Sequence, residues 1–538
     1  MNPLKNFFKE AKFDIPASIV VFLVAVPLCL GIALACKVSP FAGIIAGIVG
    51  GTVVSLFSNS SLGVSGPAAG LVAIVLSAVE DLGSFETFLL AVVLAGVFQL
   101  IIGFLRAGTI GYYFPSAVIK GMLAAIGVII ILKQIPHALG DDKDFEGDEG
   151  FLQPDGENTF TEIFKAFTDT FQGLNANLGP TIIALVGAVL LILWEQKFIK
   201  KQSWALWIQG PLIVVMSGIG LNLLFRGFPS LTIAKEHLVN LPVFDSWSSF
   251  ASEFKRPDFS AIFNPQIYTV AITLGIVASI ESLLCAEATD KLDPQKRSTD
   301  LNQELKAQGI GNIVSGLLGG LPITQVIVRS SANIQSGGRT RASAFMHGLL
   351  ILLAAVAFPF ALNLIPKASL AAILIMVGLK LAKPSLFRDL YKLGWTQFVP
   401  FMVTLVAIVL TDLLIGISMG LVVGLFIIIR NNFNIPYTVS KEKAEGGKLI
   451  YRIVLSEDVS FLNKSSIRKM LYEIPENTHV ILDASNTEHI DYDVIDIIED
   501  FKTYASYKEI SYEFVAIDEN HPYAKAEAIK KGVGNSGH

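Results

Sequence analysis

Residues 321–336 read LPITQVIVRSSANIQS and place a fixed positive charge, Arg329, among residues that are otherwise apolar or small and uncharged. The stretch follows the glycine-rich segment GIGNIVSGLLGG and begins with a break at Pro322. A similar order occurs earlier, where GIIAGIVGGTVVSLF precedes VSGPAAGLVAIVLSA at 64–78, broken at Pro67. Short segments interrupted by Gly and Pro at corresponding positions of two halves predict a transporter with its substrate site between them.

The composition is that of a membrane protein. Of 538 residues, 52% are hydrophobic and only 16% charged, whereas soluble domains average about a quarter charged. The mean hydropathy is +0.58, and apolar stretches recur at nearly the length that crosses a bilayer, about 20 residues. We therefore expect a polytopic helical bundle. The approximate cores of its fourteen expected spans are 15–35, 40–57, 66–79, 85–105, 114–133, 179–196, 205–225, 267–285, 303–319, 322–336, 343–362, 368–381, 396–411 and 413–430.

Loop charges predict the orientation. An even number of spans places both termini on one side, and the loops on that side carry Lys and Arg, as in KFIKK and RTRAS. The long loop at about 137–178 is instead rich in Asp and Glu and falls on the other side. The excess of basic residues indicates cytoplasmic loops. We therefore expect a multi-pass protein of the inner or plasma membrane, with both termini in the cytoplasm.

The sequence changes character after Arg430. Strand-like KLIYRIVL, HVILDAS and SYEFVAID alternate with helix-like KSSIRKMLYEI and DYDVIDIIEDFKTYA, and a last helix is expected near 523–531. Alternating strands and helices predict a small α/β domain of about 90 residues. The expected domains are thus a transmembrane domain at 1–435 and a cytoplasmic domain at 445–535.

The chemistry of the expected site follows from its helix ends. By the span count the two interrupted segments are spans 3 and 10, so the repeat unit has seven spans and the second copy is inverted. Two half-helices that meet near the bilayer centre direct N-termini, each with about +0.5 of an elementary charge and free N–H groups, into one gap. Such a gap attracts an anion. Small residues let the anion approach the backbone; they are Ser65, Gly66, Ala68, Ala69 and Thr324.

Two charged residues stand inside the expected spans. An Arg at the centre of a membrane-spanning helix is unfavourable by about 2.5 to 3.5 kcal/mol on insertion scales. Arg329 therefore either supports a bound anion electrostatically or forms a purely structural ion pair with a carboxylate. Glu281, in VAITLGIVASIESLLCAEATD, is the second. A carboxyl group in a dry site favours its protonated form, which suits proton-linked transport. The alternative is that Glu281 only neutralises Arg329, and both can hold in different states of a cycle.

Four motifs in order resemble the sulfate permease (SulP) family of anion transporters: VSGPAAG, IESLLCAEATDKLD, GIGNIVSGLLGGLP and VRSSANIQSGGRT. The tail is similar to the family's C-terminal STAS domain. The resemblance implies a seven-plus-seven inverted repeat with a core domain (spans 1–4 and 8–11) and a gate domain (spans 5–7 and 12–14), an elevator-like motion and a homodimer. It places the substrate site on Ser65, Gly66, Pro67, Ala68, Ala69, Thr324, Gln325, Val326, Ile327 and Arg329, with Glu281 as the ion-coupling residue.

Departures from the family pattern bear on the coupling ion. Pro27 is followed by Leu28 where many relatives have Gln. Sodium-coupled bicarbonate relatives resemble IDSLLT in span 8, whereas this chain has Glu281 for the Asp, Cys285 for the Thr and Ile327 for a second Thr. These changes favour protons over sodium, and IESLLCA resembles the proton-linked, dicarboxylate-carrying bacterial branch.

The sequence thus predicts a secondary active transporter of a small anion (bicarbonate, sulfate or a C4-dicarboxylate), coupled to protons. The alternatives are sodium-coupled bicarbonate uptake, a nucleobase-type carrier of the same architecture, an anion channel, and a scaffold whose STAS domain is the active part. A scaffold would have no reason to keep both Glu281 and Arg329 in lipid. The sequence contains no phosphate-binding loop, metal-ligand spacing or catalytic triad, so we expect no enzyme activity, cofactor, metal or nucleic-acid partner.

Overall fold

The computed structural model describes residues 3–142, 158–172, 178–200, 202, 208–228, 231–241, 247–357, 359–433, 437–443 and 449–516. The chain divides into two compact units, residues 1–421 and 422–538, which are treated separately below. Most of the acidic loop and the helix expected near 523–531 lie outside the described residues.

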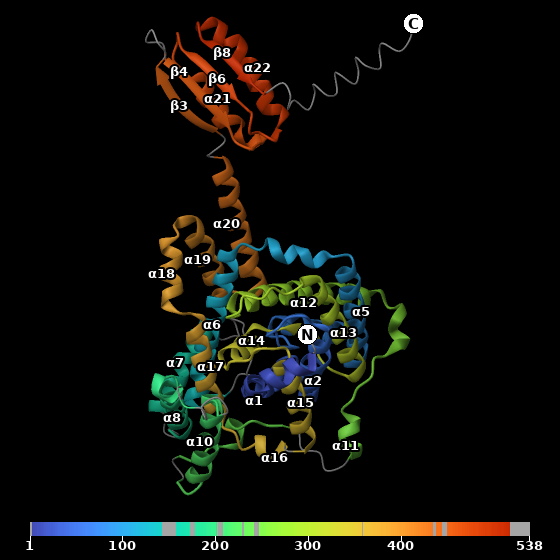
Figure 1. Cartoon of the computed structure of the whole chain (residues 1–538). Coiled ribbons are helices and arrows are strands. Elements are labelled where there is room, and N and C mark those ends of the chain that lie inside the picture. The colour runs from blue at the N-terminus through green and yellow to red at the C-terminus, as the bar shows by residue number, and fades with distance from the viewer. Residues whose placement is uncertain are drawn as a thin grey trace. The chain divides into compact units, whose positions relative to one another are not determined.

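The first unit is mainly helical (Figure 1). Its helices, the last of which contains the boundary between the units, are α1 (Pro3–Ala35), α2 (Pro40–Val49), α3 (Ser55–Phe57), α4 (Val72–Leu82), α5 (Phe85–Phe104), α6 (Ser116–Leu139), α7 (Thr159–Gln172), α8 (Gly179–Trp194), α9 (Lys197–Lys200), α10 (Gly210–Phe225), α11 (Trp247–Ser252), α12 (Pro265–Leu292), α13 (Leu301–Leu318), α14 (Ile327–Gln335), α15 (Ala342–Ala357), α16 (Pro359–Leu362), α17 (Lys367–Leu381), α18 (Pro384–Lys392), α19 (Trp395–Leu410) and α20 (Leu413–Phe433). A π-helical segment, η1 (Gly50–Val54), joins α2 to α3. The 3-10 segments are η2 (Ala69–Leu71), η3 (Ala107–Tyr113), η5 (Lys235–His237) and η6 (Phe259–Phe263).

Seven of the described helical stretches are long and apolar enough to cross a membrane. They are Glu10–Ala35, Pro40–Phe57, Phe85–Phe104, Ser116–Leu139, Pro265–Leu292, Lys367–Lys392 and Leu413–Arg430. Four shorter apolar helices accompany them: α8, α10, α15 and α19. These helices give a multi-pass membrane fold, while the count of fourteen spans and the inverted repeat stay predictions.

The first unit also contains two short strands, which the expectation of an all-helical membrane domain missed. Strand β1 (Ser65–Pro67) pairs antiparallel with β2 (Ile323–Gln325). Each expected half-helix therefore starts later in the sequence than expected. Helical structure begins at Ala69 after β1 and at Ile327 after β2. We call this pair of strands the ribbon. Non-helical backbone at membrane depth is tolerated where it is buried in protein, and all six ribbon residues are buried.

The helices of the first unit fall into two groups by their packing. Helices α1, α2, α5, α12, α13, α14 and α15 pack on one another and around the ribbon, whereas α6, α8, α10, α17 and α19 pack together. Figure 1 shows α6, α8, α10 and α17 on one side of the unit. These groups contain helices expected in the core and gate domains, a division that remains a prediction. Close packing of α5 on α13 depends on Gly309, where an added Cβ would lie 2.7 Å from the carbonyl oxygen of Gly96.

The second unit confirms the expected alternation of strands and helices. Its four-stranded sheet has the order β3-β4-β6-β8, with β3 and β4 antiparallel and the other neighbours parallel. Its elements are β3 (Tyr437–Lys443), β4 (Leu449–Leu455), β5 (Asp458–Val459), η7 (Phe461–Asn463), α21 (Lys464–Tyr472), β6 (His479–Asp483), β7 (His489–Ile490), α22 (Tyr492–Tyr507) and β8 (Ser511–Val515). Buried apolar residues of the sheet and both helices form its core.

Candidate anion-binding site

The ribbon brings the two interrupted segments together. Its register pairs Ser65 with Gln325, Gly66 with Thr324 and Pro67 with Ile323. Each strand leads directly into a helix, β1 into η2 and α4 and β2 into α14. No side-chain cap is formed at the starts of these helices, all of which the structure describes. First-turn N–H groups without a cap are available for an anion, which the helix dipole also favours.

Arg329 is the most unusual residue at the site. Its side chain is 1% exposed, and neither Nη1 nor Nη2 has a hydrogen-bond partner among the described residues. Buried charges are normally paired because an isolated charge in a low-dielectric interior is unstable. Neither of these two nitrogens is hydrogen-bonded to Glu281, and the pairing of Arg329 with Glu281 stays a hypothesis. A half-helix that began at the expected start of span 10, residue 322, would place Arg329 about two turns in. Because α14 begins at Ile327, Arg329 lies in its first turn instead.

The guanidinium group lies beside the ribbon backbone. A Cβ added to Gly66 would lie 1.9 Å from Nη1, so the absence of a side chain at position 66 creates the space that the group occupies. The thiol of Cys29, on α1, and the ring of His347, on α15, also interact with Arg329. Arg329 thus sits where α1, α14, α15 and β1 meet, with its positive charge against the ribbon.

Glu281 lies near the other half of the site. It is 4% exposed on α12, and an added Cβ at Gly70 would lie 3.3 Å from its Oε2 atom. The carboxyl group therefore packs against η2, the segment that links β1 to α4. Arg329 thus lies next to β1, and Glu281 lies next to η2, which follows β1 in the sequence. Both charged residues therefore border the same short segment, residues 66–70.

The two faces of the ribbon differ in chemistry. Side chains alternate along a strand, so Ser65 and its partner Gln325 share one face, while Gly66 and Thr324 share the other. Gln325 Nε2 donates to Thr289 Oγ1 at 3.1 Å, and Ser65 Oγ accepts from Gln308 Nε2 at 2.7 Å. Thr324 Oγ1 is buried with no partner among the described residues. The Gly66–Thr324 face therefore offers an unused hydroxyl, whereas Ser65 and Gln325 are engaged by neighbouring helices.

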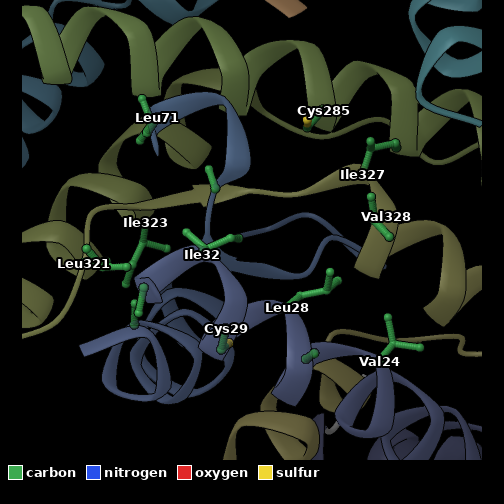
Figure 2. Close-up of a cluster of buried hydrophobic side chains, with 14 of the residues drawn as sticks. Val24, Leu28, Cys29, Ile32, Leu71, Cys285, Leu321, Ile323, Ile327 and Val328 are labelled. Carbon is green, nitrogen blue, oxygen red and sulfur yellow. The ribbon is translucent and has the colours of Figure 1, made fainter. Parts of the chain in front are cut away.

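The remaining predicted site residues are mostly apolar and border the ribbon. Pro67, Ala68 and Ala69 lead from β1 into η2, and Val326 and Ile327 lead from β2 into α14. Figure 2 shows Leu71, Cys285 and Ile327 on one side of the strands and Leu28, Cys29 and Ile32 of α1 on the other. Leu28, which stands where many relatives have Gln, belongs to this apolar cluster. An apolar surrounding lowers the local dielectric and strengthens the interaction of Arg329 with any anion.

Sequence reasoning missed a polar network behind the ribbon. Gln308, which binds Ser65, also donates to Glu304 Oε1 at 2.7 Å, and Glu304 Oε2 is hydrogen-bonded to Ser58 Oγ. Glu304 is 1% exposed and Gln308 fully buried. The available signal was a carboxylate at the start of the expected ninth span, where it looked like a solvated helix end. Of the two partners of Glu304, Gln308 lies one helical turn later and Ser58 lies 246 residues away in the sequence. Gln308 and Ser65 are 243 residues apart, so only the fold reveals the network.

A separate charged cluster lies away from the ribbon. His137 Nδ1 is 2.5 Å from Asp142 Oδ1, and His237 Nδ1 is 2.6 Å from Asp142 Oδ2. Lys367 Nζ lies 4.0 Å from the same carboxylate. Burial alone would raise the pKa of Asp142, but the hydrogen bonds to both histidines and the charge of Lys367 outweigh it and hold that pKa below its usual value. A cavity of about 410 Å³ separates this cluster from α1 at Pro27.

Comparisons with known proteins agree with the geometry. Residues 12–404 match the Sulfate permease family. The bicarbonate transporter BicA of Picosynechococcus sp. is 26% identical over 445 residues, which cover 80% of this chain and 72% of BicA. The chloroplastic sulfate transporter 4.1 of Arabidopsis thaliana is 25% identical over 533 residues, covering 92% of this chain and 73% of the relative.

The fold is that of a solved relative. The structure of SLC26A9 superposes with a TM-score of 0.67 at 14% identity, and the match covers 98% of this chain and 87% of SLC26A9. At that identity the likeness concerns the fold, and it extends over both units of the chain. Both BicA and sulfate transporter 4.1 are named as transporters, which confirms the expectation that the chain is not an enzyme.

Proposed function

Because the chain belongs to the sulfate permease family of anion transporters, we propose that it is a secondary active transporter that couples the uptake of a small anion to protons. The substrate class is bicarbonate, sulfate or a C4-dicarboxylate. BicA and sulfate transporter 4.1 carry the first two of these anions in their names. The proposed site consists of the predicted residues of the ribbon and the two helix starts, together with Arg329.

The observation that carries the proposal is that Nη1 and Nη2 of Arg329 have no hydrogen-bond partner among the described residues. A buried cation of this kind, 1% exposed, is stabilised when a negative group joins it for part of the cycle. The uncapped start of α14 and the free hydroxyl of Thr324 lie on the same short segment. An anion with several oxygen atoms, such as sulfate, bicarbonate or a carboxylate, can accept from all of these donors.

We assign the coupling role to Glu281. Its carboxyl group packs against η2 at one end of the segment that Arg329 borders at the other, so its charge opposes an anion bound there. Protonation removes that charge and favours anion binding, while loss of the proton favours release. The two ligands thereby strengthen each other's binding, which is the thermodynamic requirement for symport. The proposal includes an elevator-like motion of core against gate, homodimerisation, and an inner or plasma membrane location with both termini and the STAS domain in the cytoplasm.

Uptake by proteoliposomes tests this function. Labelled bicarbonate, sulfate and fumarate are offered in turn with an imposed inward proton gradient or an inward sodium gradient. We expect one of the three to accumulate under the proton gradient. Accumulation driven by sodium and indifferent to protons would contradict the coupling, and the absence of uptake of all three would contradict the substrate class.

Two pairs of variants test the site. Glu281→Gln should remove stimulation by the proton gradient, whereas Glu287→Gln, on the same helix but paired with Lys291, should not. Arg329→Ala should abolish uptake in a protein that remains folded, with Arg388→Ala as the control for loss of one positive charge. Normal uptake by Arg329→Ala would reduce Arg329 to a packing residue.

A further inference from the structure

A second buried carboxyl group, Glu304, has no place in the mechanism proposed above. It lies in the first turn of α13 and is 1% exposed. Its Oε1 atom accepts from Gln308 Nε2 at 2.7 Å, and its Oε2 atom is hydrogen-bonded to Ser58 Oγ. No Lys, Arg or His of the described ranges forms an ion pair with it. Both of its hydrogen-bond partners in the described part of the chain are therefore neutral.

The charges around Glu304 do not favour its ionised form. Asp290, on α12, is the charged group that interacts with it, and the interaction is repulsive. Arg341 approaches the same region, but its Nη1 donates at 2.9 Å to the carbonyl oxygen of Ser58 and not to the carboxyl group. The other elements that pack on α13 are α2, α3, α5, η1, η3 and β2. Apart from tyrosines, their only ionisable side chain is that of Glu86, in the first turn of α5. Helix α13 itself contains Lys306, and Asp300 caps its start.

We propose that Glu304 is a second proton-binding group of the transport cycle. The inference rests on the proposed proton-coupled function and adds a group to it. Removing a carboxylate from water is unfavourable unless a cation compensates it, and the charge that acts on Glu304 is that of another carboxylate, Asp290. Glu304 therefore holds a proton at neutral pH, and gives it up when the surroundings of α13 change during the cycle.

Ser58 provides the route by which the proton is exchanged. Its Oγ atom contacts Glu304 and also accepts from the backbone N–H of Ser60 at 3.0 Å. The residues before it, Leu56 and Phe57, are 60% and 46% exposed. Ser58 itself is 5% exposed and thus lies between the buried acid and these exposed residues. A proton that arrives at Ser58 Oγ releases the hydroxyl proton of Ser58 to Glu304 Oε2, and the reverse transfer returns it, with no other bond changed.

Gln308 connects the proton to the anion site. The same Nε2 atom that donates to Glu304 donates at 2.7 Å to Ser65 Oγ, the side chain of the first ribbon residue. Loss of the proton leaves a negative charge two hydrogen bonds from the ribbon, where it opposes a bound anion. Glu304 acts on the anion through Gln308 and Ser65 and is therefore a positioning and coupling residue, not one that touches the substrate.

Infrared spectroscopy of the full-length protein tests whether Glu304 is protonated. A protonated carboxyl group gives a C=O stretching band that a carboxylate lacks, and this band is followed across neutral pH. We expect Glu304→Gln to lose one such band. The control Glu80→Gln, which removes an exposed acid, should lose none. A complete set of bands in Glu304→Gln would overturn the proposal.

The coupling role is tested by transport. The number of protons moved per anion is obtained from the potential at which net uptake stops, in wild-type and variant proteoliposomes. Glu304→Gln should lower that number by one and keep uptake that is still stimulated by protons. An unchanged number in Glu304→Gln would overturn the inference while leaving the proposed function intact. Wild-type uptake that ignores protons would overturn both.

Ser58→Ala provides a second test should Glu304→Gln fail to fold. It keeps the carboxyl group but removes its exchange partner. We expect the infrared band of Glu304 to remain and to shift, and proton-driven uptake to slow by about tenfold, which corresponds to about 1.4 kcal/mol in the barrier. An unshifted band together with a wild-type uptake rate would overturn the route through Ser58 and with it the proposal.

Discussion

The substitution Gly66→Ala tests whether the charge of Arg329 acts on the anion across the ribbon. The new Cβ would lie 1.9 Å from Nη1, whereas ordinary contact begins at 3.4 Å. The guanidinium must therefore retreat by about 1.5 Å, which a long side chain can do without unfolding the protein. The backbone itself accepts Ala, because Gly66 lies in an extended strand.

The size of the effect follows from Coulomb's law. With an effective dielectric constant of about 20, an anion about 4 Å from the guanidinium gains about 4 kcal/mol, and at about 5.5 Å it gains about 3 kcal/mol. The loss of about 1 kcal/mol corresponds to a five- to tenfold rise in the KM for the anion. Complete removal of the charge in Arg329→Ala should cost about 4 kcal/mol, or about a thousandfold.

Uptake rates at varied anion concentration provide the assay, and Gly220→Ala is the matched control because no atom lies within 4 Å of a Cβ added there. The decisive comparison is a double-mutant cycle. If Gly66→Ala acts through Arg329, it should have little further effect in the Arg329→Ala background. An equal effect in both backgrounds, or a wild-type KM in Gly66→Ala alone, would refute the reasoning.

Three further predictions concern stability. The pKa of Asp142 is held below its usual value in the folded protein. Its stabilising contribution is therefore present above about pH 4 and is lost as the pH falls below the unfolded carboxyl range. The difference in Tm between wild type and Asp142→Asn should narrow as the pH falls below about 4, and an unchanged difference down to pH 3 would contradict this. Gly309→Val should destabilise the packing of α5 on α13 by about 1 to 3 kcal/mol, because its Cβ would meet backbone atoms at 2.7 and 2.9 Å; an unchanged Tm would contradict the packing. Asp491 caps α22, so Asp491→Ala should cost about 1 kcal/mol, measured as faster amide hydrogen exchange in the first turn of α22; unchanged exchange would show that the cap contributes nothing.

Much of the site could be predicted because charges inside apolar stretches are conspicuous. Arg329 and Glu281 stand out in the sequence, and the paired breaks at Pro67 and Pro322 mark where the two halves correspond. The strands themselves could not be predicted, since three residues carry no periodic signal and their pairing joins residues 258 positions apart, such as Gly66 and Thr324. Local sequence therefore suggested helices that begin too early, and so placed Arg329 too deep in its helix.

The role proposed for Glu304 could not be predicted for a related reason. Its place at a helix start resembles that of a solvated acid, and its burial depends on contacts from Ser58 and from α12. Only the tertiary structure shows that no counterion pairs with it among the described residues. In the α/β unit, strands β4, β6 and β8 were predictable because each has the length and apolar residues of a typical strand. Strands β3, β5 and β7 were not predicted, and β3 (Tyr437–Lys443) precedes the expected start of the domain at 445.

The pairing of β1 with β2 also constrains how the protein is made. At a synthesis rate of about 5 to 20 residues per second, the 258 residues that separate Gly66 from Thr324 take about 13 to 52 seconds to emerge. During that time the first strand has no partner for its backbone groups, which cannot remain unsatisfied in hydrocarbon. Until β2 is synthesised, the backbone groups of β1 must therefore be satisfied by other partners, such as water, the insertion machinery or neighbouring helices of the first half. The anion site is consequently assembled late, when the second half of the chain enters the membrane.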